Sequence, residues 1–481
     1  MVHTRSTGRI MIAAPASGQG KTTVTLGLLG AFRRRGVKAA PFKVGPDFID
    51  PGLHRLAAGG AVSHNLDGWM LPQEENRALL LRHSVGCEIA VIEGVMGLFD
   101  GYSQPNARPA PGSTAEMALW LAAPTILVVD AHGLAQSIAA LVSGFQQYEP
   151  RLRLAGVIAT KVGSDGHAKL LAEALQEGCG FPLFGAILRD AELAIPERHL
   201  GLKTAEEFGR QEALFSRLAE VFAARVDLDA VMEAAGSAPA LAGEPFATQE
   251  PAAEPARVTI AVARDRAFCF NYADNFDRLR RAGARLLFFS PLEQTRLAPG
   301  VDALWLGGGY PELYAAELAD NSAMRREIAA FARAGGPVYA ECGGFIYLCR
   351  ELVTAEGRRY PMAGVFPLAV RMDSRLRALG YREVAVGEGH PFFPAGMLLR
   401  GHEFHYSQLE AAAASQAGLR LTLELRARGR SAAEGYCLGR TVGSYAHLHL
   451  GCNPQAAESF VEAVAAARHA HAARAGMGDH G

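Results

Sequence analysis

A glycine-rich loop near the start of the chain has the composition of a phosphate-binding site. The apolar run Ile10–Ala14 leads into the sequence PASGQGKTT, and an amphipathic stretch follows it. This order of strand, glycine-rich turn, Lys-Thr and helix is that of a P-loop, in which backbone N–H groups surround phosphate oxygens. We expect Lys21 to reach the β- and γ-phosphates and the Thr22 hydroxyl to bind Mg²⁺. The predicted nucleotide-binding residues are Gly18, Gly20, Lys21, Thr22 and Thr23.

Acidic residues that could complete a Mg²⁺ site lie in two other segments. Mg²⁺ needs more oxygen ligands than one threonine supplies. Asp47 and Asp50 lie in a turn bounded by glycine and proline, whereas Glu93 ends a short apolar run and Asp100 follows it. Because ligands of open α/β sheets bind at the carboxyl ends of strands, we expect Asp47 and Glu93 to lie near the metal with Thr22. Each carboxylate could instead be an ordinary solvated turn residue.

A second candidate site is a cysteine that follows a buried strand. The apolar run Val338–Ala340 leads to Cys342 and two glycines, and an apolar helical stretch comes next. This is the strand–turn–helix order of a nucleophile elbow, in which the helix N-terminus favours the thiolate. His447 is the candidate base. Backbone N–H donors for an oxyanion hole are predicted at Gly308, Gly309 and Gly343. The alternative is a cysteine that acts as a small buried hydrophobe, which is how the other six cysteines are interpreted.

The elements that would position both sites follow an α/β pattern. Short apolar runs alternate with helical stretches, which predicts mainly parallel sheets covered by helices. In the first half we predict a helix over Thr22–Arg35 and strands over Ile10–Ala14, Ile89–Ile92, Thr125–Val129 and Leu154–Ala159. In the second half we predict strands over Val258–Ala263, Leu286–Phe289, Ala303–Leu306 and Val338–Ala340.

A composition change divides the chain. Residues 234–256 are rich in Ala, Pro, Gly and Glu and indicate a linker. We therefore expect a P-loop domain over residues 1–233, a second domain over residues 257–466 and a tail over residues 467–481.

Bulk composition excludes several classes of protein. The 48 Lys and Arg residues nearly balance 49 Asp and Glu, so there is no basic surface of the kind that binds nucleic acid. The longest apolar run is too short to span a bilayer, and the apolar stretch before the glycine-rich loop is shorter than a secretory signal requires, so we expect none there. The seven cysteines form no CxxC pair. We expect a cytoplasmic protein without a nucleic-acid or membrane partner, and a homodimer is compatible with the sequence.

Several longer segments carry a resemblance to known proteins. The first domain resembles the dethiobiotin-synthetase-like group of P-loop enzymes, and the second resembles the class I, triad-type glutamine amidotransferases with their flavodoxin-like fold. Their order resembles the cobyrinic acid a,c-diamide synthase family over nearly the whole chain. The segments that carry this resemblance are Phe42–Pro51, Asn65–Met70, Glu93–Asp100 and Pro196–Leu202.

The resemblance implies an enzyme of cobalamin biosynthesis with two reactions. Cys342, activated by His447, would attack L-glutamine to give a thioester and ammonia. The first domain would use MgATP to phosphorylate the a and c carboxylates of a corrinoid, and ammonia would displace the phosphate. Asp50 and Asp100 match family positions associated with the synthetase site.

Two positions depart from the related patterns. Many amidotransferases of this class carry a glutamate two residues after the histidine, where this chain has His449. We predict a Cys–His dyad, or a histidine oriented by another acceptor. Related P-loop domains often read Asn-Arg where this chain has Thr160-Lys161, which leaves the base contact open.

Three alternative functions remain from the sequence. Hydrogenobyrinic acid, or a tetrapyrrole such as nickel-sirohydrochlorin, could replace cobyrinic acid as substrate. A partitioning-type nucleotide-switch ATPase is of a different class, but it gives the Cys342 elbow no role.

Overall fold

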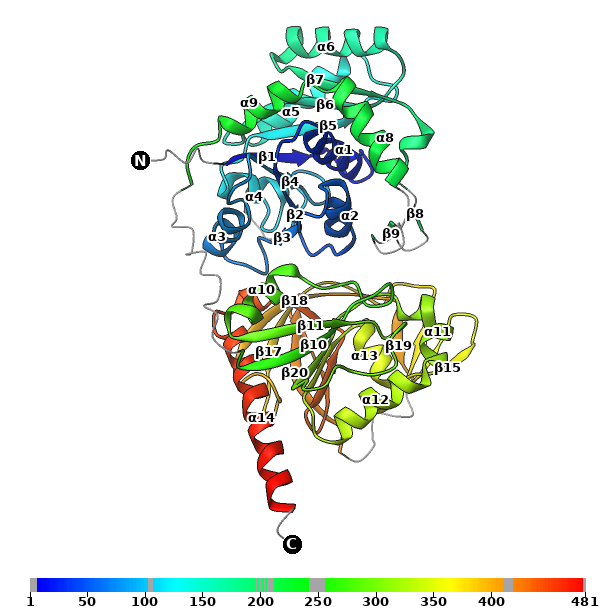
Figure 1. Cartoon of the computed structure of the whole chain (residues 1–481). Coiled ribbons are helices and arrows are strands. Elements are labelled where there is room, and N and C mark those ends of the chain that lie inside the picture. Colours follow the sequence, from blue (N-terminus) through cyan, green and yellow to red (C-terminus); the bar gives the residue numbers. More distant parts are fainter. Residues whose placement is uncertain are drawn as a thin grey trace. The chain divides into compact units, whose positions relative to one another are not determined.

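The chain forms two compact units, residues 1–248 and 249–481, and each is described by itself (Figure 1). The structure, a computed structural model, describes residues 7–102, 107–195, 197–198, 201–202, 205, 212–241, 256–410 and 418–478. Part of the predicted linker and three residues of the segment Pro196–Leu202, namely 196, 199 and 200, lie outside the described residues. Among the described helices, none has the length and apolar character needed to cross a bilayer.

Unit 1 is built on a seven-stranded sheet in the order β3-β2-β4-β1-β5-β6-β7. All its strand pairs are parallel, and helices flank it, as the alternating pattern predicts. The strands are β1 (Gly8–Ala13), β2 (Ala39–Val44), β3 (His64–Leu66), β4 (Ile89–Glu93), β5 (Thr125–Asp130), β6 (Leu154–Val162) and β7 (Leu183–Leu188). The helices are α1 (Lys21–Arg34), α2 (Ile49–Ala57), α3 (Gln73–His83), α4 (Thr114–Trp120), α5 (Ser137–Tyr148), α6 (Asp165–Cys179), α8 (Glu212–Arg225) and α9 (Leu228–Gly236). Short strands β8 (Glu197–Arg198) and β9 (Gly201–Leu202) pair with each other.

Helix α1 is buried over most of its length because two glycines let α8 approach it closely. A Cβ atom on Gly27 would lie 2.2 Å from the Phe222 ring, and one on Gly30 would lie 2.8 Å from Ala219 Cβ. Both partner residues belong to α8 and are buried. This contact fixes the helix whose first residues belong to the P-loop.

The sheet order brings the predicted catalytic segments of unit 1 to one edge. Strands β2, β4 and β1 are neighbours, and each runs in the same direction. Their carboxyl ends lead into the turn with Asp47, into Glu93 and into the P-loop. Parallel neighbours therefore bring these three segments to the same edge of the sheet.

Unit 2 contains a ten-stranded mixed sheet in the order β11-β10-β12-β13-β22-β21-β20-β17-β18-β23. Its first five strands are parallel neighbours, whereas the others pair in antiparallel fashion. The second half of this sheet therefore departs from a purely doubly wound pattern. The strands are β10 (Val258–Ala263), β11 (Ala284–Phe289), β12 (Ala303–Leu306), β13 (Val338–Glu341), β17 (Ala378–Val386), β18 (Leu398–His405), β20 (Arg420–Ala427), β21 (Arg430–Leu438), β22 (Thr441–Ser444) and β23 (His447–Leu448).

A smaller four-stranded sheet and several helices complete unit 2. The sheet order is β15-β14-β16-β19. Its strands are β14 (Cys349–Val353), β15 (Arg359–Pro361), β16 (Phe366–Met372) and β19 (Ser407–Leu409). The helices are α10 (Ala273–Arg281), α11 (Ala315–Asp320), α12 (Ser322–Arg333), α13 (Gly343–Leu348) and α14 (Ala456–Gly478).

Two predicted boundaries differ from the observed elements. Helix α9 continues into the predicted linker as far as Gly236, because Val231 and Ala235 are four residues apart and both are buried. Helix α14 continues through the predicted tail as far as Gly478. Both stretches are rich in alanine, which favours a helix as strongly as it suggests a low-complexity segment.

Two candidate active sites

The P-loop adopts the backbone conformation that its glycines permit. Gly18 and Gly20 have φ values of 77° and 97°, and Gly20 caps the N-terminus of α1. The Thr160 hydroxyl donates to the Gln19 carbonyl at 3.0 Å. The Gln19 side chain in turn accepts the Asp130 N–H at 3.0 Å. Thr160 thus stabilises the P-loop backbone through this hydrogen bond. The resemblance to P-loop domains with Asn-Arg at this position did not predict that role.

Lys21 and Thr22 project from the first turn of α1 toward the loop after β4. The Lys21 ammonium donates to the Met96 carbonyl at 2.5 Å. Burial, together with the nearby charge of Lys43, lowers the pKa of Lys21. Thr23 follows on α1 and is partly buried. The predicted phosphate-binding residues therefore lie together at the start of one helix.

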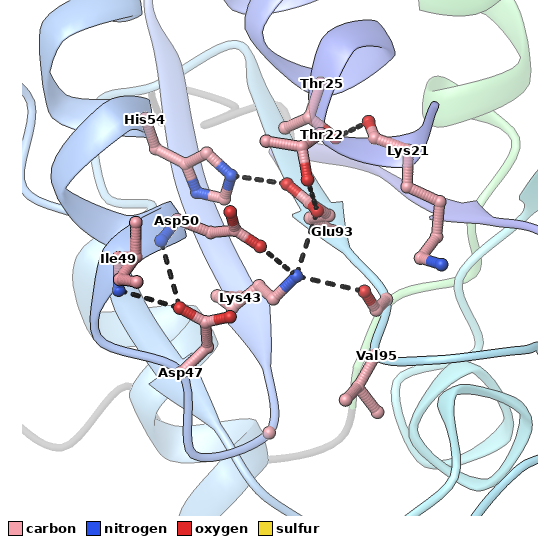
Figure 2. Close-up of polar contacts among 12 residues, drawn as sticks. Lys21, Thr22, Thr25, Lys43, Asp47, Ile49, Asp50, His54, Glu93 and Val95 are labelled. Atoms are coloured by element: carbon pink, nitrogen blue, oxygen red, sulfur yellow. Dashed lines mark hydrogen bonds and ion pairs between the residues drawn. The ribbon is translucent and has the colours of Figure 1, made fainter. Parts of the chain in front are cut away.

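Glu93 is the centre of the polar network in unit 1 (Figure 2). It is fully buried, and its Oε1 accepts the Thr22 hydroxyl at 2.7 Å and the Lys43 ammonium at 2.9 Å. Its Oε2 accepts from His54 Nε2 at 2.6 Å. Burial alone would raise the pKa of Glu93, but Lys43 and His54 outweigh it and hold that pKa well below its usual range. Glu93 is therefore ionised at neutral pH.

Lys43 joins Glu93 to Asp50, as Figure 2 shows. The Lys43 ammonium lies 2.5 Å from Asp50 Oδ2, and both side chains are almost fully buried. Burial and the charges of Asp47 and Glu93 raise the pKa of Asp50. Burial opposes the charge on Lys43, yet the carboxylates outweigh burial and raise its pKa. One lysine thus holds two buried carboxylates.

Sequence reasoning did not single out Lys43 or His54. The available signals were a lysine inside an otherwise apolar run, residues 39–44, and a histidine four residues after Asp50 on the same helix face. His54 Nδ1 lies 3.0 Å from the Ser63 hydroxyl, so both ring nitrogens have partners.

Asp47 and Asp100 have local structural roles as well. Asp47 Oδ1 accepts the N–H groups of Ile49 at 2.7 Å and of Asp50 at 3.0 Å, which fixes the start of α2. Asp100 is exposed, and its Oδ2 accepts the Gly97 N–H at 2.9 Å. Asp47, Asp50 and Glu93 come together around Lys43, whereas Asp100 lies on the loop after β4.

The oxygen donors at this edge fit a Mg²⁺ ion. Thr22 Oγ1 keeps lone-pair capacity, and Asp47 Oδ2 accepts no hydrogen bond among the described residues. Both Glu93 oxygens already have donors, so Glu93 fits an outer position beside Thr22 better than a direct one. Mg²⁺ usually keeps several waters, which suits two direct protein ligands.

Cys342 of unit 2 occupies a strained turn between β13 and α13. Its φ and ψ are 44° and −103°, a conformation that residues with a side chain rarely adopt. Its N–H donates to the Ser444 carbonyl at 2.7 Å. A Cβ on Gly344 would lie 2.2 Å from the Leu306 carbonyl oxygen, so the helix after Cys342 can pack here only with glycine. This geometry is that of a nucleophile elbow.

His447 lies beside Cys342 on β23. Its imidazole is hydrogen-bonded to the Cys342 side chain. Its Nδ1 lies 3.6 Å from Glu341 Oε2. Burial lowers the pKa of His447, but the interactions with the Cys342 side chain and the nearby Glu341 carboxylate outweigh burial and raise that pKa to about 10. The raised pKa favours the imidazolium form of His447 beside the Cys342 sulfur.

The three glycines predicted for the oxyanion hole lie together, with one difference from the prediction. The Gly308 N–H donates to the Phe270 carbonyl at 3.1 Å, so it is not available to an oxyanion. A Cβ on Gly308 would lie 2.2 Å from His447 Cε1, so this glycine provides space for the imidazole. A Cβ on Gly343 would lie 2.9 Å from Gly309 N. The N–H groups of Gly309 and Gly343 have no acceptor in the described part of the chain and remain the predicted donors.

Strand β18 covers the cysteine from another side. The Cys342 sulfur lies 4.0 Å from the Phe404 carbonyl oxygen. His402 pairs with His447 across β18 and β23, and His405 stacks on Tyr445 with 3.9 Å between ring centroids. Burial is the main cause that lowers the pKa of His402 to about 3 and that of His405 to about 4. Both histidines, which the sequence left unassigned, are therefore neutral at pH 7.

Comparisons with known proteins match both units. Residues 10–202 match the family described as CobQ/CobB/MinD/ParA nucleotide binding domain. Residues 259–454 match the CobB/CobQ-like glutamine amidotransferase domain. The observed P-loop and cysteine elbow lie within these two ranges.

Curated relatives match nearly the whole chain. A cobyrinate a,c-diamide synthase of Syntrophotalea carbinolica is 44% identical over 455 residues, which are 94% of this chain and 98% of the relative. A cobyrinate a,c-diamide synthase of Dehalococcoides mccartyi is 41% identical over 94% of this chain and 97% of the relative. A hydrogenobyrinate a,c-diamide synthase of Mycobacterium bovis is 46% identical over 82% of this chain and 85% of the relative. By this similarity along both units, the chain belongs to the cobyrinate a,c-diamide synthase family.

Proposed function

We propose that the chain catalyses the ATP- and glutamine-dependent amidation of the a and c carboxylates of cobyrinic acid. The observation that carries this proposal is that each unit holds the groups for one half of the reaction. Unit 2 has a cysteine in an elbow with a histidine bonded to it. Unit 1 has a P-loop whose Thr22 is bonded to a buried, ionised Glu93.

Glutamine would be hydrolysed in unit 2. The Cys342 thiolate attacks the side-chain amide carbon, and the negative charge that develops on oxygen is stabilised by the N–H groups of Gly309 and Gly343. The His447 imidazolium gives its proton to the departing nitrogen, so that the C–N bond breaks and ammonia leaves a thioester. Water then attacks the thioester with His447 as base, which releases glutamate and restores the thiol.

The corrinoid carboxylate would be activated in unit 1. A carboxylate oxygen attacks the γ-phosphorus of ATP, and ADP leaves. Lys21 stabilises the charge on the transferred group after it exchanges the Met96 carbonyl for phosphate oxygens. Ammonia then attacks the acyl phosphate, and phosphate leaves as the amide forms.

A Mg²⁺ ion bound with ATP would neutralise charge on the phosphates. Thr22 and Asp47 are the residues that would hold it, and Glu93 would act on it through Thr22 or through water. Lys43 and His54 keep Glu93 ionised and in place. Asp50 and Asp100 are proposed for the same synthetase site, where Asp50 fixes the Lys43 ammonium and Asp100 lies close enough to affect Lys21.

Two variants test the division between the units. Cys342→Ser should abolish amidation driven by glutamine but leave amidation driven by free ammonia, because unit 1 is untouched. Lys21→Ala should lose amidation with either nitrogen source. Failure of ammonia to rescue Cys342→Ser, or full ammonia-driven activity in Lys21→Ala, contradicts the two-site mechanism.

One comparison makes hydrogenobyrinic acid a second candidate substrate. The hydrogenobyrinate-named relative is 46% identical, close to the 44% of the first cobyrinate-named one, so identity does not separate the two acceptors. Amidation of purified cobyrinic and hydrogenobyrinic acids, each with MgATP and glutamine, decides between them. The acceptor with the higher kcat/KM is the substrate.

A further inference from the structure

Glu341 is a buried carboxylate that immediately precedes the nucleophile. It ends β13, and 2% of the residue is exposed. A buried carboxylate is costly unless hydrogen bonds or an opposite charge compensate for its lost hydration. Its neighbours in β13 are apolar or aromatic. The position therefore requires a specific partner.

Both oxygens of Glu341 are directed at groups around the catalytic histidine. Oε1 accepts the Tyr339 hydroxyl at 2.8 Å and the Leu448 N–H at 3.1 Å. Oε2 lies 3.6 Å from His447 Nδ1. Because Leu448 directly follows His447 in β23, one carboxylate binds the backbone of that strand and faces the imidazole beside it. Its position relative to the ring is fixed from two sides.

The residue two places after the histidine has another role. His449 is fully buried, its Nδ1 accepts the Gly451 N–H at 3.1 Å, and its ring lies 4.9 Å from that of Tyr272. It also contributes to the low pKa of Asp274, where Arg278 and His449 together outweigh burial. His449 is thus engaged with α10 and its surroundings, so the acidic partner of His447 must come from a different element.

We propose that Glu341 is a positioning residue that orients the His447 imidazole and stabilises its protonated form during glutamine hydrolysis. A carboxylate on Nδ1 fixes the tautomer and leaves Nε2 for the Cys342 sulfur. The 3.6 Å separation is an ion-pair distance, and catalytic contacts often shorten when substrate binds. The inference rests on the proposed glutaminase step. The strand that leads into the nucleophile, β13, would supply the acid that many related enzymes carry after the histidine.

The other charges around His447 are already compensated or neutral. The titratable groups that interact with it come from the elbow and from β18: Glu341, Cys342, His402, Glu403 and His405. The Arg382 guanidinium donates to Glu403 at 2.6 Å, and the two β18 histidines are neutral at pH 7. Among the described residues, Glu341 forms no ion pair other than that with His447. Its charge is therefore available to the imidazolium.

The test is Glu341→Gln, which keeps the shape and can keep the bonds to Tyr339 and Leu448 but removes the charge. With saturating MgATP and corrinoid, glutamate release from L-glutamine should fall about 10²-fold or more in kcat at neutral pH, because the imidazole loses its orienting charge. KM for glutamine should change little. The alkaline limb of kcat should move to lower pH by roughly one unit or more, because the imidazolium loses its proton more easily. Ammonia-driven amidation should remain.

Two further variants separate charge from packing. Tyr339→Phe removes one hydrogen bond from the same carboxylate but keeps its charge, so the alkaline limb should stay at the wild-type pH. Glu341→Asp also keeps the charge, so the pH of its alkaline limb should lie close to that of the wild type even if its kcat is lower. The proposal is overturned if Glu341→Gln retains the wild-type kcat and limb, or if Tyr339→Phe or Glu341→Asp displaces the limb as far as Glu341→Gln does. If Glu341→Gln does not fold, the alkaline limb of Glu341→Asp decides. A limb near the wild-type pH supports the proposal, and a limb displaced by roughly one unit or more overturns it. A wild-type protein that releases glutamate without amidating the corrinoid contradicts only the proposed acceptor and leaves these comparisons valid.

Discussion

Replacement of Lys43 by methionine should destabilise unit 1 strongly, because this lysine is the countercharge for two buried carboxylates. The lysine side chain is 5% exposed, and its ammonium lies 2.5 Å from Asp50 and 2.9 Å from Glu93. Removing one partner of a buried ion pair typically costs about 3–5 kcal/mol. Asp50 can relieve part of this cost by taking up a proton, since its pKa is already raised. We therefore expect a loss of about 3 kcal/mol in the free energy of opening of unit 1, or roughly two orders of magnitude in its equilibrium constant.

The loss should depend on pH in a defined direction. Lys43 and His54 depress the pKa of Glu93 in the folded state, so the stabilisation it gives is complete above the unfolded glutamate pKa of about 4.3 and is lost as pH falls below that value. Lys43→Met removes the main cause of this depression. The difference between wild type and variant should accordingly be largest near pH 7 and should shrink as the pH falls below about 4.3.

Hydrogen exchange measured by mass spectrometry gives this free energy in the full chain. Peptides from β2 and β4 report on unit 1, and peptides from β10 and β12 of unit 2 serve as an internal control. Lys169→Met is a matched control, because the Lys169 side chain is 80% exposed and lies 3.8 Å from Glu173. It should change stability by no more than about 0.5 kcal/mol. A change of less than about 1 kcal/mol for Lys43→Met at pH 7 would refute the reasoning.

Three other substitutions test separate parts of the structure. Gly308→Ala should lower glutamine-driven amidation by at least about tenfold and spare ammonia-driven amidation, because its Cβ would lie 2.2 Å from His447 Cε1; equal loss with both nitrogen sources would contradict this. Gly27→Ala should destabilise unit 1 by about 1–3 kcal/mol and lower its thermal unfolding midpoint, because the new Cβ would lie 2.2 Å from the Phe222 ring. An unchanged midpoint in calorimetry would contradict the close packing of α1 on α8. Thr160→Val should raise the KM for ATP several-fold, corresponding to about 1 kcal/mol for the lost hydrogen bond to the P-loop, with glutaminase activity as the control that stays constant.

The sequence predicted the architecture best where strands are apolar and end in chemically distinctive residues. The runs Val258–Ala263 and Ala303–Leu306 are observed as strands with the predicted bounds. Periodicity could not predict that half of the sheet in unit 2 is antiparallel, because pairing direction depends on connections rather than on the composition of a strand. The end of α9 and the second half of α14 fall within the predicted linker and tail, because an alanine-rich composition is compatible with both a helix and a low-complexity segment.

Candidate site residues could be predicted where they belong to a sequence motif, and less well where they matter only through the side chains that the fold places beside them. Lys21, Thr22 and Cys342 stand in recognisable loops, and the structure places each in the expected turn. Lys43 and Glu341 have no motif, because their importance arises from what parallel neighbours place beside them. A single charged residue near the end of an apolar strand was the signal for both. Gly308 was predicted as part of this site, but its function was not. Because its N–H is bonded to the Phe270 carbonyl, it provides space for the imidazole rather than a donor for an oxyanion.

The central claim is that both units cooperate to convert two corrinoid carboxylates to amides with nitrogen from glutamine. Mass spectrometry of the product formed from cobyrinic acid, MgATP and glutamine labelled with ¹⁵N in its side-chain amide tests this most directly. The two-site mechanism predicts a product in which two carboxylates have become amides and both new nitrogens carry the label. Release of glutamate and phosphate with an unchanged corrinoid, or amides without the label, would contradict it.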